Sequence, residues 1–451
     1  MDNQQIVIKI HIDKESEKQF FRLFFNVPDN VESMNIKYTY LGDNLSTLPK
    51  EYEKNIIDFA LLDENGIMAG ATGSNKKDIT ISESYSTPGY NKIAINKGQW
   101  TIIYGVYLTY SVGVDVTYTI TFTFKHTRWM KGDLHIHSVY SDGNLTINEL
   151  GLKAVKSGLD FFISTDHNNF FHNKRLPDIE NLTIIPGVEF THYNGHMNFM
   201  GIETPYLRSY AVNSFEEFKA LNKEAHDRGA LISINHPLCS ICPWKWGFSD
   251  FYYDIVEIWN GPMRKDNLRA IEWWHNELVK GRKLPAVGGS DFHKDFPIIN
   301  LFATPTTVVY ADSPSKNDIL CAIRGGRVVI THSPKSSMIE MTSGNAVIGD
   351  SVILQDNTII NINVSKLNRK HTLIVYDKTG IIHQYKAKKS APYSISLPIK
   401  NNGFVRAEIK YYPKLFARLG YRMVLFFMLR KQTFDKIPDF ILTLTNPIYF
   451  D

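Results

Sequence analysis

The hydrophobic and polar positions of the first 125 residues alternate in run after run, which is the pattern of strands with one buried face. The clearest run is residues 114–124, in which every second side chain is apolar. Polar segments rich in glycine and asparagine, such as TGSNKKD and INKGQW, separate the runs and indicate turns. This pattern predicts an N-terminal antiparallel β domain over residues 1–128, with one face in water.

A different pattern begins after Arg128, where short apolar runs alternate with stretches of helical period. The predicted strands are LHIH, FFIST, TIIPGVE, MNFMGI, LISINH, DIVEIW, PAVGGSD and TTVVY. The predicted helices cover about 146–156, 214–228 and 265–280. Repeated β-then-α units favour a parallel sheet, and this many of them predict a closed or nearly closed α/β barrel over residues 129–335. In such barrels the active site lies at the carboxyl ends of the strands.

Strand-like patterns return in the last part of the chain and predict a small β-sandwich-like domain over residues 336–451. The segment KLFARLGYRMVLFFMLRKQ, residues 414–432, interrupts them, and its apolar run is too short to span a bilayer. A helix packed on the barrel or a buried strand is the favoured interpretation. The alternative is a basic amphipathic segment that lies on a membrane or on a lipid-like substrate.

Composition places the chain among ordinary soluble globular proteins, because 43% of its 451 residues are hydrophobic, 21% are charged and the formal net charge is +4. Its length suggests three domains. Three cysteines, Cys239, Cys242 and Cys321, cannot make a disulfide framework, and CSIC lacks the second CxxC of a structural zinc site, so a redox role is the lesser alternative. The N-terminus has no signal-peptide pattern, and we expect a cytoplasmic protein.

Imidazoles and carboxylates stand at the ends of the predicted barrel strands, in HIHSVYSDG, STDHN, PGVEF, GHMN, INHP and GGSDFH. So many ionisable groups in one cleft are costly unless cations hold them. Nitrogen and oxygen donors without a thiolate suit divalent manganese, zinc or iron rather than calcium, and the donors suffice for more than one ion. Centres of this kind polarise phosphoryl or acyl oxygens and activate water, so we expect a hydrolase.

Taken in order, DLHIHSVYSDG, STDHN, PGVE, GH, NHP and GSDFH resemble the PHP (polymerase and histidinol phosphatase) metal-dependent hydrolases. More weakly, EIWNGP, IRGGRVVIT, FVRAEI and LTNPIYF resemble the CehA/McbA branch of that superfamily. The motif resemblance covers roughly residues 131–335. It implies a distorted (β/α)7 TIM-like barrel with two or three divalent metal ions, flanked by the two β domains.

The resemblance also implies how the donors are shared. One metal would be held by His135, His137, Glu189 and Asp291. A second would share Glu189 and add His196 and His236. A third would take Asp142, His167 and His293, with a metal-bridging hydroxide as the nucleophile. His192 is the alternative to His196. Asp166, which precedes His167, could bind a metal, but a hydrogen bond that orients an imidazole is the favoured role.

Cationic groups at the rim should complement an anionic substrate. Arg264, after EIWNGP, and Lys294, after His293, are the candidates, and for each the alternative is a solvated loop residue. Asn260 is a further rim candidate. The predicted catalytic set is Asp142, His167, Glu189, His293 and Arg264. We expect ordinary surface or core roles for His172, His226, His275, His332 and the pair Trp273–Trp274.

Three functions remain open at this point. The leading hypothesis is a phosphoesterase that acts on a small-molecule or nucleotide phosphomonoester or phosphodiester, with nucleic acid only as a substrate. A carbamate or carboxylic-ester hydrolase is the alternative suggested by the branch, since the aromatic residues in 244–253 could bind an aryl leaving group or could simply cap the barrel. The third is a non-catalytic scaffold whose β domains bind partners. No pattern in the chain predicts an oligomeric state.

Overall fold

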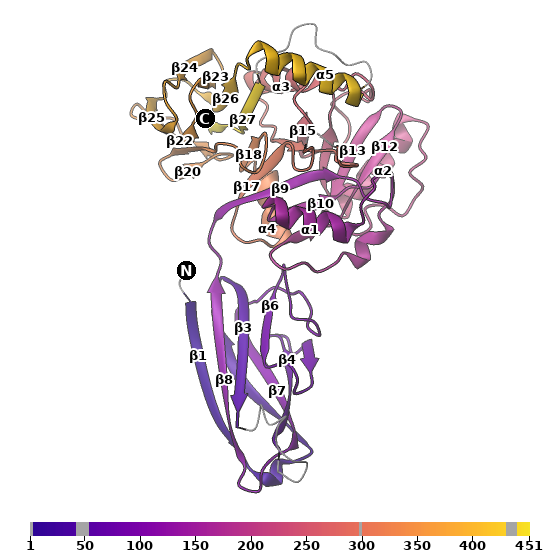
Figure 1. Cartoon of the computed structure of the whole chain (residues 1–451), viewed down its shortest axis with the longest axis vertical. Coiled ribbons are helices and arrows are strands. Elements are labelled where there is room, and N and C mark those ends of the chain that lie inside the picture. Colours follow the sequence, from indigo (N-terminus) through magenta and orange to yellow (C-terminus); the bar gives the residue numbers. More distant parts are fainter. Residues whose placement is uncertain (1–2, 42–53, 297–299, 430–439) are drawn as a thin grey trace. The chain divides into compact units, whose positions relative to one another are not determined.

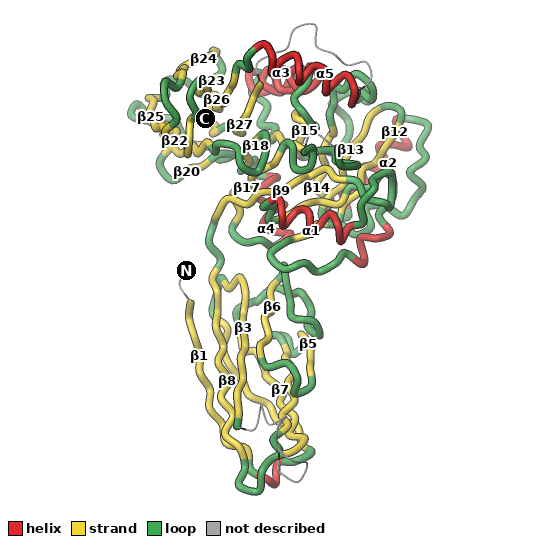
Figure 2. The backbone as a smooth tube through the Cα atoms, viewed as in Figure 1, coloured by secondary structure: helices red, strands yellow, loops and turns green. Residues whose placement is uncertain are grey.

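The computed structural model describes residues 3–41, 54–296, 300–429 and 440–451 (Figure 1). The chain forms two compact units, Met1–Thr127 and Arg128–Asp451. The first consists almost entirely of strands, whereas the second mixes strands and helices (Figure 2).

Two four-stranded sheets make up the first unit. One has the order β1-β8-β3-β6, formed by β1 (Asn3–Ile12), β8 (Val114–Phe124), β3 (Val31–Tyr40) and β6 (Asp78–Ser82). The other has the order β2-β7-β4-β5, formed by β2 (Gln19–Val27), β7 (Gly98–Leu108), β4 (Ile56–Leu62) and β5 (Met68–Thr72). The strand pairs of both sheets are antiparallel, and alternate residues of β8 are buried, as the alternating pattern predicts.

The second unit contains two sheets that carry the predicted site residues. In the first, β10 (Phe161–Ser164) pairs in parallel with β11 (Thr183–Ile185) and with β9 (Arg128–Ile136). The second has five strands in chain order, which are β12 (Gly187–His192), β13 (Gly195–Met200), β14 (Leu231–Asn235), β15 (Ile255–Asn260) and β16 (Ala286–Gly289).

Single bridges connect these two sheets near the carboxyl ends of β9 and β10. Ile136 bridges to Phe292, just after β16, and His167 bridges to Glu189 in β12, both in parallel. The seven strands β9, β10 and β12–β16 are thereby linked edge to edge. Because isolated bridges rather than ladders make these two links, a regular (β/α)7 TIM-like barrel stays a prediction.

The expected parallel sheet is only partly correct. The pairs β14–β15 and β15–β16 are parallel, but β13 is antiparallel to both β12 and β14. The cause is the short turn Tyr193–Asn194, which is followed by Gly195 at a φ of 117° and joins β12 to β13 without a helix. A connection this short reverses the chain, whereas a parallel neighbour needs a long crossover.

The three predicted helices form within one or two residues of their expected bounds. The helices of this region are α1 (Ile147–Ser157), α2 (Phe215–Asp227), α3 (Lys265–Val279) and α4 (Lys316–Arg324), the last of which was not predicted. Thr146 caps α1 by accepting a hydrogen bond from the amide of Glu149, whose carboxylate accepts in return from the amide of Thr146. Such reciprocal capping fixes where a helix begins.

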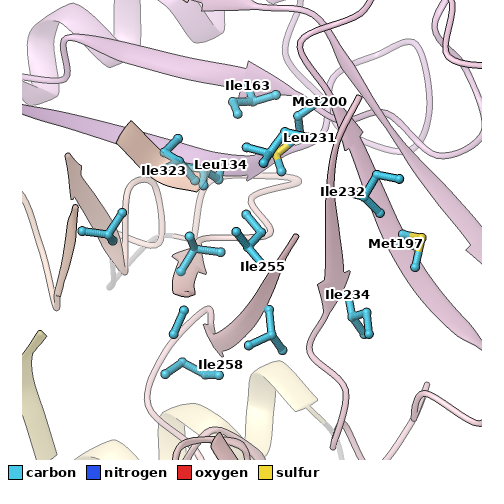
Figure 3. Close-up of a cluster of buried hydrophobic side chains, with 14 of the residues drawn as sticks. Leu134, Ile163, Met197, Met200, Leu231, Ile232, Ile234, Ile255, Ile258 and Ile323 are labelled. Carbon is cyan, nitrogen blue, oxygen red and sulfur yellow. The ribbon is translucent and has the colours of Figure 1, made fainter. Parts of the chain in front are cut away.

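Apolar side chains from the site-bearing strands pack together beneath the site. Figure 3 shows Leu134 of β9, Ile163 of β10, Met197 of β13, Ile232 of β14 and Ile255 of β15 in one buried cluster. Burial of one such side chain contributes about 1.5–3 kcal/mol. The strands that carry polar donors are therefore held on a rigid apolar base.

The C-terminal strands extend the sheet of β9 rather than standing apart from it. The order continues from β9 through β17 (Thr306–Ala311), β18 (Val328–Thr331), β27 (Phe440–Thr445), β26 (Gly403–Tyr411), β23 (His371–Asp377) and β24 (Gly380–Lys386). β28 (Ile448–Phe450) pairs with β26, and β21 (Ser351–Val352) pairs with β28. A separate sheet comprises β20 (Ala346–Val347), β19 (Ile339–Ser343), β22 (Ile359–Leu367) and β25 (Ala391–Pro398). A domain boundary near residue 335 stays a prediction.

The segment 414–432 is helical over α5 (Leu415–Leu429), so a buried strand is the wrong interpretation; residues 430–432 lie outside the described part. Tyr421 fixes one face of α5 by donating its hydroxyl hydrogen bond to the carbonyl of Met263 at 2.7 Å. Among the side chains of α5 that the structure describes, the apolar ones that are more than half exposed are Leu415, Phe416, Leu419, Met423 and Phe426. Contact of this face with a membrane surface stays a prediction.

Among the helices that the structure describes, none has both the length and the apolar character needed to cross a membrane. A cytoplasmic location stays a prediction.

Candidate metal centre

Neighbouring strand ends of the second unit bring the predicted donors together. β9 supplies His135, and His137 follows directly after its last residue; the side chains of both are almost fully buried. Main-chain bonds tie the loop after β16 to this strand: the amide of Asp291 donates to the carbonyl of His135 at 2.8 Å, and the amide of His137 donates to that of Phe292 at 2.9 Å. Asp291 and His293, which belong to this loop, therefore lie beside the histidine pair.

The approach of β16 to β9 requires glycine. A Cβ atom on Gly289 would lie 2.4 Å from Cβ of His135 and 2.4 Å from Oε1 of Glu257. No ordinary van der Waals contact is that short, so any side chain here would push the histidine strand away. The GGSD sequence thus positions the loop that carries Asp291.

Glu189, on β12, lies at the centre of the donor atoms, and its side chain is 1% exposed. Its Oε1 atom is 3.2 Å from Nε2 of His135, 3.1 Å from Nδ1 of His196 and 3.5 Å from Nε2 of His236. A carboxylate oxygen shared by three imidazoles is placed as a bridging ligand would be.

The second oxygen of Glu189 faces a further group of donors. Its Oε2 atom is 2.7 Å from Nδ1 of His167 and 3.6 Å from Nε2 of His137. Asp142 closes this group, with Oδ1 at 3.6 Å from Nε2 of His167 and at 3.2 Å from Nε2 of His293. The side chains of the predicted third set, Asp142, His167 and His293, therefore lie together, and they are more exposed than those of His135, His137 and Glu189.

The donor set fits metal ions. Buried Nε2 atoms of His135 and His137 have no hydrogen-bond partner among the described residues, although each lies near the carboxylate of Asp291, at 3.5 and 3.1 Å from Oδ1. Ligand bonds of about 2.0–2.2 Å put neighbouring donors of one ion about 3.0–3.5 Å apart, which is close to these spacings. Within the described chain, several groups of His, Cys, Asp and Glu could hold an ion, among them His135–His137–Asp291.

Charge in the centre is balanced between the imidazoles and the acids. Burial alone would raise the pKa of Glu189, but the adjacent His135, His167 and His196 hold it well below its ordinary value. Burial alone would lower the pKa of His135, but Glu189 and other acids raise it well above its ordinary value. Burial lowers the pKa of His137. Cations that bind here would displace protons from such imidazoles.

Glu257, in β15, is a site residue that the sequence analysis missed. It is 2% exposed, and its Oε1 atom lies 3.0 Å from Nδ1 of His135, on the ring edge opposite the shared donors. Its Oε2 atom accepts hydrogen bonds from the amide of His236 at 3.1 Å and from Nδ2 of Asn260 at 3.2 Å. The available signal was a lone acid inside the apolar run DIVEIW.

Asp166 lies beside an imidazole, as expected, but beside that of His172 rather than that of a predicted ligand. It accepts hydrogen bonds from the amide of Ser138 at 2.8 Å and from the hydroxyl of Ser141 at 2.6 Å, and so holds the loop between β9 and α1. The imidazole nearest to it is His172, at 3.3 Å. His172 therefore has a structural partner beside the site.

Of the two alternatives in EFTHYNGH, His196 faces Glu189 whereas His192 faces backbone. The ring of His192 lies 3.0 Å from the carbonyl of Val212 and accepts a hydrogen bond from the amide of Asn194 at 3.1 Å. The structure thus brings His196, not His192, to the donor cluster.

The rim candidates differ in their surroundings. Arg264 donates from Nη2 to Oδ1 of Asn260 at 2.7 Å, and Nδ2 of Asn260 lies 3.4 Å from Oδ2 of Asp291. The Nε atom of Arg264 is buried and has no hydrogen-bond partner within the described residues. Lys294 is exposed on the loop after His293. Asn260 therefore adjoins the donor cluster directly, and Arg264 adjoins it through Asn260.

Cys242 also adjoins the cluster, which the sequence analysis did not foresee when it counted no thiolate among the donors. Its Sγ atom is 3.7 Å from Nδ1 of His236. His196, His236 and Cys242 form another of the groups that could hold a metal ion.

A pocket of about 420 Å³ begins at Asn168, the residue after His167. The short 3-10 helix η2 (Phe171–Arg175) forms one wall, and the lining is Asn168, Phe170, Phe171, Lys174, Thr204, Tyr206, Leu207, Arg208, Ser209 and Tyr210. The hydroxyl of Tyr206 is buried and lacks a hydrogen-bond partner in the described chain. The pocket offers an aromatic wall and two cationic side chains.

The aromatic residues in 244–253 other than the exposed Tyr252 pack against the core rather than forming a free rim. Trp246 stacks on Phe218 of α2 with ring centroids 5.1 Å apart, and Phe251 meets the same ring edge-on at 5.4 Å. Trp273 likewise stacks on Phe248 at 4.5 Å. These contacts agree with the capping alternative.

Comparisons with known proteins give limited matches. No family model matches the chain. A segment of 54 residues is 35% identical to the DNA polymerase/3'-5' exonuclease PolX of Bacillus subtilis; it amounts to 12% of this chain and 10% of that protein. The match thus spans about a tenth of the relative's length.

Solved structures similar to this chain include two that are described as metal-dependent phosphoesterases or as containing one. A two-domain protein from Bacteroides vulgatus, described as containing a predicted PHP-like metal-dependent phosphoesterase, is 18% identical, with a TM-score of 0.38 over 70% of this chain and 95% of its own. A proposed metal-dependent phosphoesterase from Bifidobacterium adolescentis is 16% identical, with a TM-score of 0.28 over 42% of this chain and 96% of its own. Likenesses this distant carry no argument here, and the CehA/McbA branch stays a prediction.

Proposed function

We propose that this chain is a multinuclear metal-dependent hydrolase of the PHP type and that its substrate is a phosphoester. The observation that carries the proposal is the position of Glu189, a buried carboxylate shared by imidazoles from several strand ends, together with the buried Nε2 atoms of His135 and His137, which have no hydrogen-bond partner among the described residues. Buried donors without partners are costly, and bound cations would remove that cost.

The spacing of the donors supports the three ligand sets that the resemblance implies. The first would be His135, His137, Glu189 and Asp291. The second would be Glu189, His196 and His236. The third would be Asp142, His167 and His293. Divalent manganese, zinc or iron bound there would polarise a phosphoryl oxygen and activate water.

The chain's own residues would then bind and orient the substrate. Arg264, held by Asn260 and with a buried Nε atom that lacks a partner, is placed to bind an anionic oxygen at the rim. Its position favours a phosphoryl group over a neutral carbamate. The pocket that begins at Asn168 could hold the organic part of a small-molecule or nucleotide phosphoester.

The test is metal analysis of the purified full chain, followed by assays with Mn²⁺ or Zn²⁺ on an aryl phosphate, an aryl phosphodiester, nucleotides and an aryl carbamate. We expect two or three bound ions and hydrolysis of at least one phosphoester. His135→Ala should lose both properties, whereas His226→Ala, a change on the exposed side of α2, should keep both.

Two results would overturn the proposal. Hydrolysis of the carbamate alone would make the chain a carbamate or ester hydrolase. A protein that binds no ion after reconstitution would be a non-catalytic scaffold, in which the donor cluster serves another purpose.

A further inference from the structure

Two cysteine thiols lie in contact on the loop that follows β14. All three cysteines of the chain are free thiols, and Sγ of Cys239 is 3.4 Å from Sγ of Cys242. The buried His236 lies beside this pair, with its Nδ1 atom 3.7 Å from Sγ of Cys242 and its Nε2 atom 3.5 Å from Oε1 of Glu189. One imidazole thus lies between the thiol pair and the central carboxylate.

Main-chain and side-chain bonds hold the loop in the form that brings the thiols together. The amide of Cys239 donates to the carbonyl of His236 at 2.9 Å, and the amide of Trp244 donates to that of Pro237 at 3.0 Å. Midway between the cysteines, the amide of Ser240 donates to the carboxylate of Asp266 at 2.9 Å. The thiols are therefore paired by the backbone and not by a chance rotamer.

Closing the pair requires little movement. A disulfide bond is about 2.05 Å long, so the sulfur atoms would approach by about 1.4 Å, which side-chain rotation and a slight backbone shift can supply. Cys239 is buried, whereas Cys242 is partly exposed. Cys242 is accordingly the thiol that an external reagent reaches, and Cys239 is the thiol that resolves the adduct.

We propose that Cys239 and Cys242 form a reversible disulfide by exchange with a low-molecular-weight disulfide. The Cys242 thiol, which donates to Sγ of Cys239, first gives up its proton; its sulfur then attacks one sulfur of the reagent, a mixed disulfide forms and one small thiolate leaves. The Cys239 thiolate then attacks Sγ of Cys242 and releases the second small thiolate. Two protein thiols are oxidised, the reagent is reduced to two thiols, and the two protons from the cysteines end on those thiols.

Disulfide formation removes the thiol hydrogen of Cys242 and so weakens its contact with Nδ1 of His236, which is 3.7 Å long in the reduced pair. Partners that orient a metal-binding imidazole typically change metal affinity by about 10–100-fold when they are lost. Oxidation of the pair is therefore expected to weaken metal binding by that factor. This second effect rests on the proposed function, whereas formation of the disulfide does not.

The test uses the full chain, reduced, freed of metal, and then treated with oxidised glutathione. We expect the intact mass to fall by about 2 Da and two of the three thiols to become unreactive, both reversibly. Cys239→Ser should stop at a glutathione adduct on Cys242. Cys321→Ser, which removes the exposed cysteine of α4, should behave as the parent.

Each other outcome has a definite meaning. The proposed disulfide between Cys239 and Cys242 would be overturned by any of three results: a lasting glutathione adduct on the parent chain, an unchanged mass, or a disulfide that joins two copies through Cys321. Zn²⁺ titration of the reduced and oxidised forms separates the two claims. Equal affinity in both forms would overturn the effect on His236 and leave the disulfide standing, and failure of the reduced form to bind Zn²⁺ would count against the proposed function alone.

Discussion

Glu257→Gln should weaken metal binding while leaving the fold intact. The substitution keeps the side-chain volume but removes the negative charge that lies 3.0 Å from Nδ1 of His135. A hydrogen bond to a charged group contributes about 1.5–3 kcal/mol, and the amide retains part of it. We therefore expect a loss of about 1.4–2.7 kcal/mol in binding free energy, which corresponds to about 10–100-fold in affinity.

The measurement is calorimetric titration of the metal-free chain with Mn²⁺ and with Zn²⁺, accompanied by the thermal unfolding midpoint. Glu272→Gln, on the exposed face of the adjoining helix α3, is the matched control and should bind as the parent does. If Glu257→Gln bound both ions with parental affinity, Glu257 would not orient His135. If it unfolded at room temperature, its role would be structural.

Three further changes probe the glycine contact, a buried histidine and the pocket. Gly289→Ala should destabilise the chain by about 1–3 kcal/mol in urea unfolding, because its Cβ would meet His135 at 2.4 Å. Gly420→Ala, which meets no atom within 4 Å on α5, should be neutral or stabilising, and equal effects would contradict the argument. Burial, aided by the adjacent Arg406, lowers the pKa of His275 to about 4. As acid is added, His275 is therefore protonated at a higher pH in the unfolded chain than in the folded chain. Its protonation lowers the free energy of unfolding between about pH 6.5 and pH 4. The thermal unfolding midpoint of His275→Gln should fall less steeply with pH over that range than that of the parent. An equally steep fall would show that His275 does not cause this pH dependence. Lys174→Ala should raise KM for a nucleotide more than it lowers kcat, since the lysine lines the pocket; an unchanged KM would place the substrate elsewhere.

The donors of the site could be predicted from sequence because local periodicity determines which way a strand residue faces. His135 near the end of β9 and His137 just after it lie on one side of the chain for this reason, and Asp291 and His293 stand at the end of a later predicted strand, PAVGGSD. What could not be predicted depends on contacts between distant segments. Glu257 belongs to a continuously apolar strand whose two faces are both buried, so its pattern does not tell which face meets His135.

The arrangement of strands was harder to predict than the strands themselves. The turn before Gly195 reverses β13, and no helical stretch in the sequence announces this reversal. The C-terminal strand β27 pairs with β18 across more than a hundred residues of chain, a register that local patterns cannot specify. Asp166 was assigned to a neighbouring imidazole because the two are adjacent in sequence, yet its carboxylate turns toward Ser138 and Ser141.

The shared carboxylate of Glu189 implies that occupancy at one position alters the next. Fixing Oε1 beside His196 also fixes Oε2 beside His167, because both oxygens belong to one planar group. Binding of the first ion would thus already order a ligand that a later ion uses, which favours the second binding step, whereas repulsion between the cations would oppose it. The metal ions should therefore not bind independently of one another. In a metal titration, the successive dissociation constants should differ from the ratio expected for independent sites.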